Sequence, residues 1–220
     1  MADSASPTAS IVVLISGSGT NLQALIDQTV HGTIAARIAA VISNRPGAGG
    51  IDRARQAGIT TELLDHTNFQ DREAFDEKLA ETILRYKPDI VVLAGFMRIL
   101  TPAFVRQFQG KMVNIHPSLL PKYKGLHTHK RALEAGDTEH GATVHFVTEE
   151  LDGGPNIIQA RVDIEENDTP ESLAGKVLLK EHQIFPQVIK WMAEQRLSMT
   201  DNRAYLDDII IPENGLQFEA

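Results

Sequence analysis

The chain has 220 residues, of which 42% are hydrophobic and 23% charged, so it can bury the core of one globular domain or at most two. Its formal net charge is −8, and no run of lysine and arginine is long enough to follow a phosphate backbone, which excludes nucleic acid as a principal partner. The absence of cysteine excludes disulfides, a thiol nucleophile and thiolate metal sites.

The N-terminal segment, residues 1–10, carries one acidic side chain and no basic one, and the apolar run at 11–15 is too short for a signal peptide. No stretch approaches the roughly 20 apolar residues that span a bilayer. We therefore expect a cytoplasmic protein with no membrane partner. Residues 1–10 are expected to form a disordered extension, 11–200 a single domain, and 201–220 a tail packed on that domain or trailing from it.

Short β-branched runs alternate with helical patterns through the first half of the chain, which is typical of βαβ units. The predicted strands span 11–15, 37–42, 60–64, 89–94 and 111–115. Helical stripes lie between them, and two are formed by Leu22, Leu25, Ile26 and Thr29 and by Phe75, Leu79, Ile83 and Tyr86. The predicted fold is α/β and Rossmann-like: a mixed, mostly parallel sheet with helices on both faces.

The second half departs from the βαβ pattern. Predicted strands at 142–147 and 156–164 flank the turn-rich segment 152–155, which indicates an antiparallel hairpin added to the sheet edge. A long helix is predicted to begin at Thr169-Pro170 and to be kinked at Pro186. Its inward-facing residues are predicted to be Leu173, Val177, Ile184 and Val188.

A glycine-rich turn, Ser16-Gly17-Ser18-Gly19-Thr20-Asn21, follows the first predicted strand and opens a helix. Its backbone N–H groups can close around an anion, and the helix N-terminus adds partial positive charge. A dinucleotide fingerprint would need a small residue in place of Leu22 and an acid in place of Ser43-Asn44-Arg45. The turn therefore favours the phosphate of a phosphosugar or mononucleotide over NAD, with a ligand-free tight turn as the alternative.

The fifth predicted strand ends in Asn114-Ile115-His116-Pro117. Ligands of open α/β sheets bind outside the carboxyl ends of the strands, and residues two apart on a strand share a face. An imidazole there can act as general acid or base while the asparagine amide stabilises an oxyanion, a combination that suits acyl transfer. The alternative is a buried pair that only satisfies backbone groups.

Two further features bear on this site. Asp152 lies on a glycine-rich loop, and if the hairpin lies beside the fifth strand it would approach His116 and favour the protonated ring. His127 and His129 could join His116 around a metal, but no carboxylate lies at ligand spacing, so no metal is expected. His145 is expected in the core, although it could face the same cleft.

Four segments together resemble the phosphoribosylglycinamide formyltransferase family: 15–22, 92–100, 114–121 and 151–155. The resemblance runs from about residue 11 to the end of the long helix. It implies the formyltransferase fold and transfer of the formyl group of 10-formyltetrahydrofolate, a co-substrate, to the amine of 5-phosphoribosylglycinamide in de novo purine biosynthesis. It further implies small-molecule substrates, no metal, and a monomer or homodimer.

The same resemblance implies the roles of individual residues. His116 would be the general acid or base, Asn114 would stabilise the oxyanion and Asp152 would tune His116. The residues implied for phosphoribosylglycinamide are Gly19, Thr20, Asn21 and Glu181. Those implied for the folate are Arg72, Met97, Arg98, Ile99, Leu100, Asn114, Thr148, Glu149, Glu150, Leu151 and Asp152. The family also suggests a cis bond before Pro121, and Lys124 stands where some members have proline.

Three other functions compete with this one. The segment 118–123 is also similar to methionyl-tRNA formyltransferases and to formyltetrahydrofolate hydrolases. The first would be expected to carry an additional C-terminal domain and a basic surface, and the second an N-terminal regulatory domain; we expect neither in this protein. A catalytically silent phosphosugar or folate sensor is the third alternative, and the intact Asn114, His116 and Asp152 argue against it.

Overall fold

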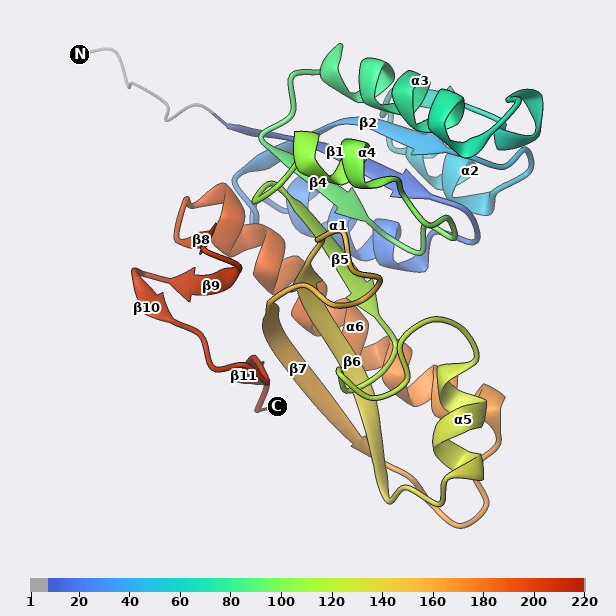
Figure 1. Cartoon of the computed structure of the whole chain (residues 1–220), viewed down its shortest axis with the longest axis vertical. Coiled ribbons are helices and arrows are strands. Elements are labelled where there is room, and N and C mark those ends of the chain that lie inside the picture. Colours follow the sequence, from blue (N-terminus) through green and yellow to red (C-terminus); the bar gives the residue numbers. More distant parts are fainter. Residues whose placement is uncertain (1–7, 220) are drawn as a thin grey trace.

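Residues 8–219 are described by the computed structural model, and Figure 1 shows their arrangement. The strands are β1 (Ala9–Ile15), β2 (Ala36–Ser43), β3 (Thr61–Leu63), β4 (Ile90–Leu93), β5 (Met112–His116), β6 (Glu139–Phe146), β7 (Asn156–Asp163), β8 (Leu197–Thr200), β9 (Arg203–Leu206), β10 (Ile209–Ile210) and β11 (Leu216–Gln217). The helices are α1 (Thr20–Val30), α2 (Gly49–Gln56), α3 (Arg72–Leu84), α4 (Pro102–Gln107), α5 (Thr128–Glu134) and α6 (Pro170–Ala193), with a short 3-10 helix, η1 (His66–Asn68).

The main sheet has eight strands in the order β11-β7-β6-β5-β4-β1-β2-β3. Strand β1 pairs in parallel with β2 and β4, and β4 pairs in parallel with β5. Strand β6 is antiparallel to both β5 and β7, while β11 runs parallel to β7. The predicted mixed, mostly parallel sheet is therefore confirmed, and the predicted strands differ from the observed ones by at most a few residues at their ends.

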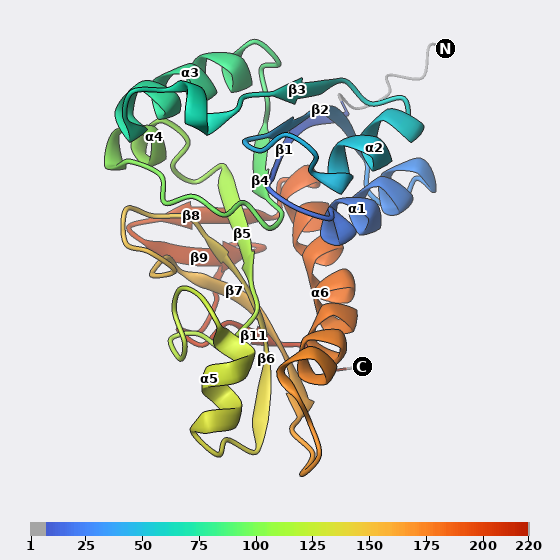
Figure 2. The ribbon, with the colours of Figure 1, turned by 90° about the vertical axis from the view of Figure 1, so that its right-hand side faces the viewer.

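Helices cover both faces of this sheet, as Figure 2 shows. Side chains of β1 alternate between the two layers because successive residues of a strand point to opposite faces. Ile11, Val13 and Ile15 pack in a core shared with α1 and α6. Val12 and Leu14 pack instead with residues of α3 and α4. Burial on both sides explains why the central strands are continuous apolar runs.

The long helix α6 begins as predicted. The Thr169 hydroxyl accepts from Ser172 N at 3.2 Å, and the Ser172 hydroxyl accepts from Thr169 N at 2.9 Å, so the two residues cap each other reciprocally. The helix continues through Pro186 to Ala193, so this proline does not end it. The four residues predicted to face inward are buried: Leu173, Val177, Ile184 and Val188.

The C-terminal segment, which gave no clear pattern, packs against the domain. Strands β8, β9 and β10 form a separate small sheet, and β11 extends the main sheet beyond β7. The Lys180 ammonium lies 5.6 Å from the centroid of the Phe218 ring, which attaches the end of the chain to α6. The expected N-terminal extension, 1–10, falls largely outside the described residues, and Ala9 and Ser10 belong to β1. Within residues 8–219, no helix is both long and apolar enough to traverse a bilayer.

Candidate active site

Asn114 and His116 lie at the carboxyl end of β5, and their side chains point to the same face of the sheet as two side chains of the neighbouring strand β6. In the antiparallel ladder Asn114 pairs with His145 and His116 with Thr143, so these four side chains point to one side of the sheet. His116 is 5% exposed. The antiparallel pairing of β5 with β6 therefore brings the imidazoles of His116 and His145 and the amide of Asn114 together in a site sheltered from water.

Asp152 approaches this group from the loop between β6 and β7. Its Oδ2 lies 3.5 Å from His116 Nδ1, and its Oδ1 lies 3.7 Å from His145 Nε2. Oδ2 also accepts a 2.8 Å hydrogen bond from Gly125 N, which fixes the carboxylate against the loop that follows β5. The loop depends on Gly154, because a Cβ there would lie 1.9 Å from the Phe146 carbonyl oxygen.

The second ring nitrogen of His116, Nε2, lies 2.9 Å from the Tyr123 carbonyl oxygen. A carbonyl oxygen only accepts, so Nε2 carries a hydrogen and Nδ1 is the nitrogen that faces Asp152. The Tyr123 hydroxyl donates to Asp137 Oδ2 at 2.7 Å, and Arg131 donates to the Lys124 carbonyl oxygen at 2.7 Å. These contacts hold the loop that orients the His116 ring.

A cavity of about 90 Å³ adjoins the catalytic candidates. Its apolar walls come from the segment after β4 and from α4, and its polar wall from the loop after β6. The lining residues are Leu93, Phe96, Arg98, Ile99, Leu100, Val105, Asn114, His145, Val147, Thr148, Glu149, Glu150, Leu151 and Asp152. Most of the residues expected to contact the folate therefore line one cavity.

Arg72 and Met97, also expected to contact the folate, do not line this cavity. The Arg72 guanidinium lies at the start of α3, 3.8 Å from Glu73, and is 44% exposed. The Met97 side chain is exposed, while its backbone N donates to the Ser16 hydroxyl at 2.8 Å. The Arg98 guanidinium lies 4.6 Å from the centroid of the Phe75 ring, so its charge is directed toward α3.

The glycine-rich turn leads from β1 into α1, as predicted. Gly19 has φ 72°, a left-handed conformation, and immediately precedes α1. Because β4 lies between β1 and β5 in the sheet, the turn and His116 are separated by two strand spacings, or about 10 Å. That separation suits a substrate with a phosphate at one end and an amine at the other.

Glu181 of α6 reaches the same turn. Its Oε2 accepts a 2.7 Å hydrogen bond from Asn21 Nδ2, although the two residues are 160 positions apart. Burial raises the pKa of Glu181 above its usual value, and the hydrogen bond from Asn21 opposes this rise. Asn21 Oδ1 is buried and has no hydrogen-bond partner among the described residues. Gly19, Thr20, Asn21 and Glu181 are thus brought together.

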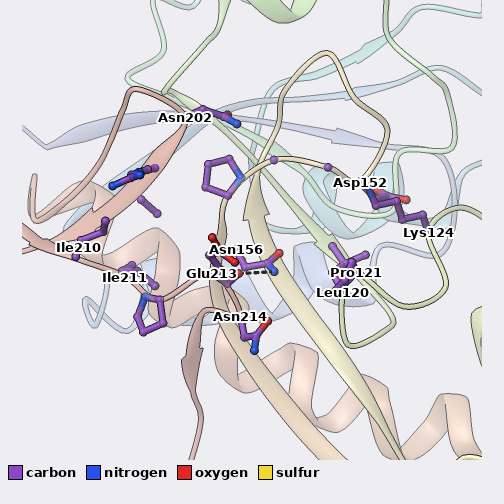
Figure 3. A pocket seen from close by; sticks show the side chains of 16 residues that line it. Leu120, Pro121, Lys124, Asp152, Asn156, Asn202, Ile210, Ile211, Glu213 and Asn214 are labelled. Atoms are coloured by element: carbon purple, nitrogen blue, oxygen red, sulfur yellow. Dashed lines mark hydrogen bonds between the residues drawn. The ribbon is translucent and has the colours of Figure 1, made fainter.

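A second, larger cavity of about 670 Å³ lies between the loop after β6 and the C-terminal strands, shown in Figure 3. Asp152 borders both cavities. The Asn156 side chain donates to the Glu213 carbonyl oxygen at 3.0 Å and so joins the two segments that line the cavity (Figure 3). Among residues 8–219, no group of three or more His, Asp or Glu side chains is arranged to hold a metal ion.

The sequence predicts His145 in the core, with the same cleft as the alternative, and gives Tyr123 and Gly125 no part in the site. His145 is indeed buried, but its ring contacts Asn114 and approaches Asp152. The signal for the cleft is that Thr143 and His145 repeat the two-residue spacing of Asn114 and His116 on the partner strand. The contributions of Tyr123 and Gly125 come from backbone atoms, which leave no signal in residue identity.

Comparison with known proteins gives consistent results. The family model "Formyl transferase" matches residues 9–189. The phosphoribosylglycinamide formyltransferase of Escherichia coli is 55% identical over 205 residues, 93% of this chain and 97% of its own, and that of Haemophilus influenzae is 50% identical over the same shares. The structure of the phosphoribosylglycinamide formyltransferase of Coxiella burnetii superposes with a TM-score of 0.92 at 51% identity, over 96% of this chain and 99% of its own.

Proposed function

The chain belongs to the formyl transferase family and, within it, to the phosphoribosylglycinamide formyltransferases, and from this membership we propose which residues carry out the transfer. The reaction moves the formyl group of 10-formyltetrahydrofolate onto the amine of phosphoribosylglycinamide in purine biosynthesis. The observation that carries the assignment is the approach of Asp152 to His116 and His145 beside the cavity that Asn114 borders.

His116 and Asn114 assist as the substrate amine forms a bond to the formyl carbon and the bond from that carbon to the folate nitrogen then breaks. As the first bond forms, negative charge develops on the formyl oxygen, and the Asn114 amide N–H stabilises it. His116 moves the proton that must leave the attacking amine and reach the departing folate nitrogen. The Asp152 carboxylate, 3.5 Å from Nδ1, stabilises positive charge on the ring while the Tyr123 carbonyl fixes its orientation.

The two substrates approach from opposite sides of these groups. The part of the folate that carries the formyl group enters the cavity lined by the segment 98–100 and the loop 148–152, because about 90 Å³ is too small for the whole molecule. Arg72 and Met97, which do not line the cavity, contact the rest of the folate. The glycine-rich turn binds the phosphate through Gly19, Thr20 and Asn21, and Glu181 contacts the same substrate. Anchoring the phosphate aligns the amine and lowers the entropic cost of the encounter.

We propose a monomeric or homodimeric state for the protein. The net charge of −8 supports small anionic substrates held by local groups instead of nucleic acid. We likewise assign it to the cytoplasm, without a membrane partner. Sedimentation of the purified protein over a range of concentrations would decide between monomer and dimer.

The experiment that tests the function is a turnover assay with 10-formyltetrahydrofolate in the presence and absence of phosphoribosylglycinamide. We expect formylated product and free tetrahydrofolate only when the amine is present. Release of formate without the amine would identify a hydrolase, and binding without any product would identify a sensor. Either result would overturn the proposal.

Glu181 gives a separate prediction about the substrate contact. Glu181→Gln keeps an acceptor for Asn21 but removes the acidic group, so we expect phosphoribosylglycinamide to bind about 10-fold to 100-fold more weakly, the value of a hydrogen bond to a charged group. Calorimetric titration of the variant with the substrate measures this. An unchanged dissociation constant would remove Glu181 from the binding site.

Glu181→Gln should also change how stability depends on pH. In wild type the folded pKa of Glu181 is raised, so as pH rises above 4.5 the unfolded chain loses this proton before the native state does. Native stability therefore falls with rising pH through that window. The variant lacks this loss of stability, so its free energy of unfolding in urea should rise relative to wild type as the pH rises above 4.5.

A further inference from the structure

His145 is a buried histidine at the centre of the site that the proposed chemistry does not use. It is 2% exposed and stands directly opposite Asn114 in the β5–β6 ladder. Its Nδ1 lies 2.8 Å from the Phe146 carbonyl oxygen, and its Nε2 lies 3.1 Å from Asn114 Nδ2. Both ring nitrogens are therefore engaged, one by the backbone and one by a proposed catalytic side chain.

The backbone contact determines which nitrogen of His145 carries the hydrogen. A carbonyl oxygen cannot donate, so Nδ1 must be the protonated nitrogen. Burial lowers the pKa of His145 to about 4, and the charges of His116 and Lys124 act in the same direction, whereas Asp152 opposes them. The ring is neutral at neutral pH, and Nε2 presents a lone pair to its neighbours.

This lone pair determines how the Asn114 amide is oriented. An acceptor nitrogen attracts the amide NH₂ and repels the amide carbonyl oxygen, so the amide must turn its Nδ2 toward His145. One of the two N–H bonds is used in that contact, and the other remains. If the amide rotated by half a turn, its carbonyl oxygen would replace Nδ2, and no donor would remain there.

We propose that His145 is a positioning residue, which holds the Asn114 amide so that its second N–H, and not its carbonyl, meets the oxygen of the formyl group. This inference rests on the oxyanion role proposed above for Asn114. Both side chains border the cavity assigned to the folate, so the free N–H lies where the donor's formyl group must enter. In this arrangement His145 acts on the transfer through Asn114, and not on the reacting atoms themselves.

The first test replaces the acceptor nitrogen. His145→Phe keeps a planar ring but removes Nε2, and we expect kcat and kcat/KM to fall together by about 10-fold or more, up to the roughly 10²–10³-fold of a lost oxyanion donor. KM for the folate should change little. His145→Gln, whose amide oxygen can accept from Asn114, should recover most of the rate. Equal losses in both variants would contradict the proposal.

A double-mutant cycle separates this inference from the proposed role of Asn114. If His145 acts through Asn114, adding His145→Phe to Asn114→Ala should cost no further activity. If Asn114→Ala leaves kcat unchanged, the oxyanion role itself fails. If Asn114→Ala lowers kcat but His145→Phe lowers it again by the same factor, only the positioning role fails.

The tautomer can be measured without turnover. In the wild-type protein labelled with ¹⁵N-histidine, NMR at neutral pH should show His145 with a protonated Nδ1 and an unprotonated Nε2. His140→Phe serves as a matched control for folding, because His140 lies on the same strand and is 1% exposed. We expect that variant to retain the tautomer of His145. A protonated Nε2 in the wild type would overturn the proposal directly.

Discussion

Replacing His116 by alanine is expected to lower kcat by about 10²–10⁴-fold, the usual contribution of a general acid or base. The dissociation constant for phosphoribosylglycinamide should change much less, because the proposed phosphate site, the turn after β1, lies two strands away. Steady-state kinetics and calorimetric titration of the same preparation measure the two quantities. Equal losses in both would mean that the imidazole serves binding or folding and not proton transfer.

Asp152→Asn tests whether the charge of the carboxylate matters. Asparagine keeps an oxygen that can accept from Gly125 N, so the loop contact is preserved while the negative charge beside His116 is lost. We expect kcat to fall by about 10²-fold, toward the lower end of the range for acid–base catalysis. The substrate dissociation constant should again stay close to that of wild type.

Asp152→Ala is the matched comparison, because it removes the charge and the acceptor for Gly125 together. If the carboxylate acts mainly by charge, the two variants should lose similar amounts of kcat. If it acts mainly by anchoring the loop, only the alanine variant should be impaired. The second outcome would reassign Asp152 from tuning His116 to holding the loop between β5 and α5.

Local sequence patterns predicted only those site residues whose positions depend on a single strand. Asn114 and His116 share a face because they are two residues apart on β5, and Met112, Val113 and Ile115 mark the strand. The position of Asp152 could not be predicted from one strand. It depends on β6 lying antiparallel beside β5, which places the end of β6 opposite Val113, and on the loop after β6 folding back toward His116.

Elements with little burial could not be predicted from periodicity. In α2 only Gly50 and Ala54 are buried, so no apolar stripe marks the helix. Strands β10 and β11 have two residues each, too few for an alternating pattern. Nor could a pattern have paired Asn21 with Glu181 across 160 positions, and only the family resemblance implied that both contact one substrate.

Gly19→Ala is expected to damage both stability and substrate binding. The backbone at Gly19 has φ +72°, which costs a residue with a Cβ roughly 1–2 kcal/mol. A Cβ there would also lie 2.5 Å from Gly50 Cα, so the turn and the start of α2 must move apart. We expect a loss of about 2–4 kcal/mol in the free energy of unfolding by urea, as for other strained or overpacked positions.

Gly17→Ala is the matched control within the same turn. In the described chain no atom lies within 4 Å of a Cβ built at Gly17, and its φ is outside the left-handed range, so stability should change by less than about 0.5 kcal/mol. The substrate's dissociation constant should rise strongly in Gly19→Ala and little in Gly17→Ala, because only the first displaces the backbone N–H groups at the start of α1. Equal weakening by both variants would show that the phosphate is held by the whole loop, whereas normal binding by Gly19→Ala would place the phosphate elsewhere.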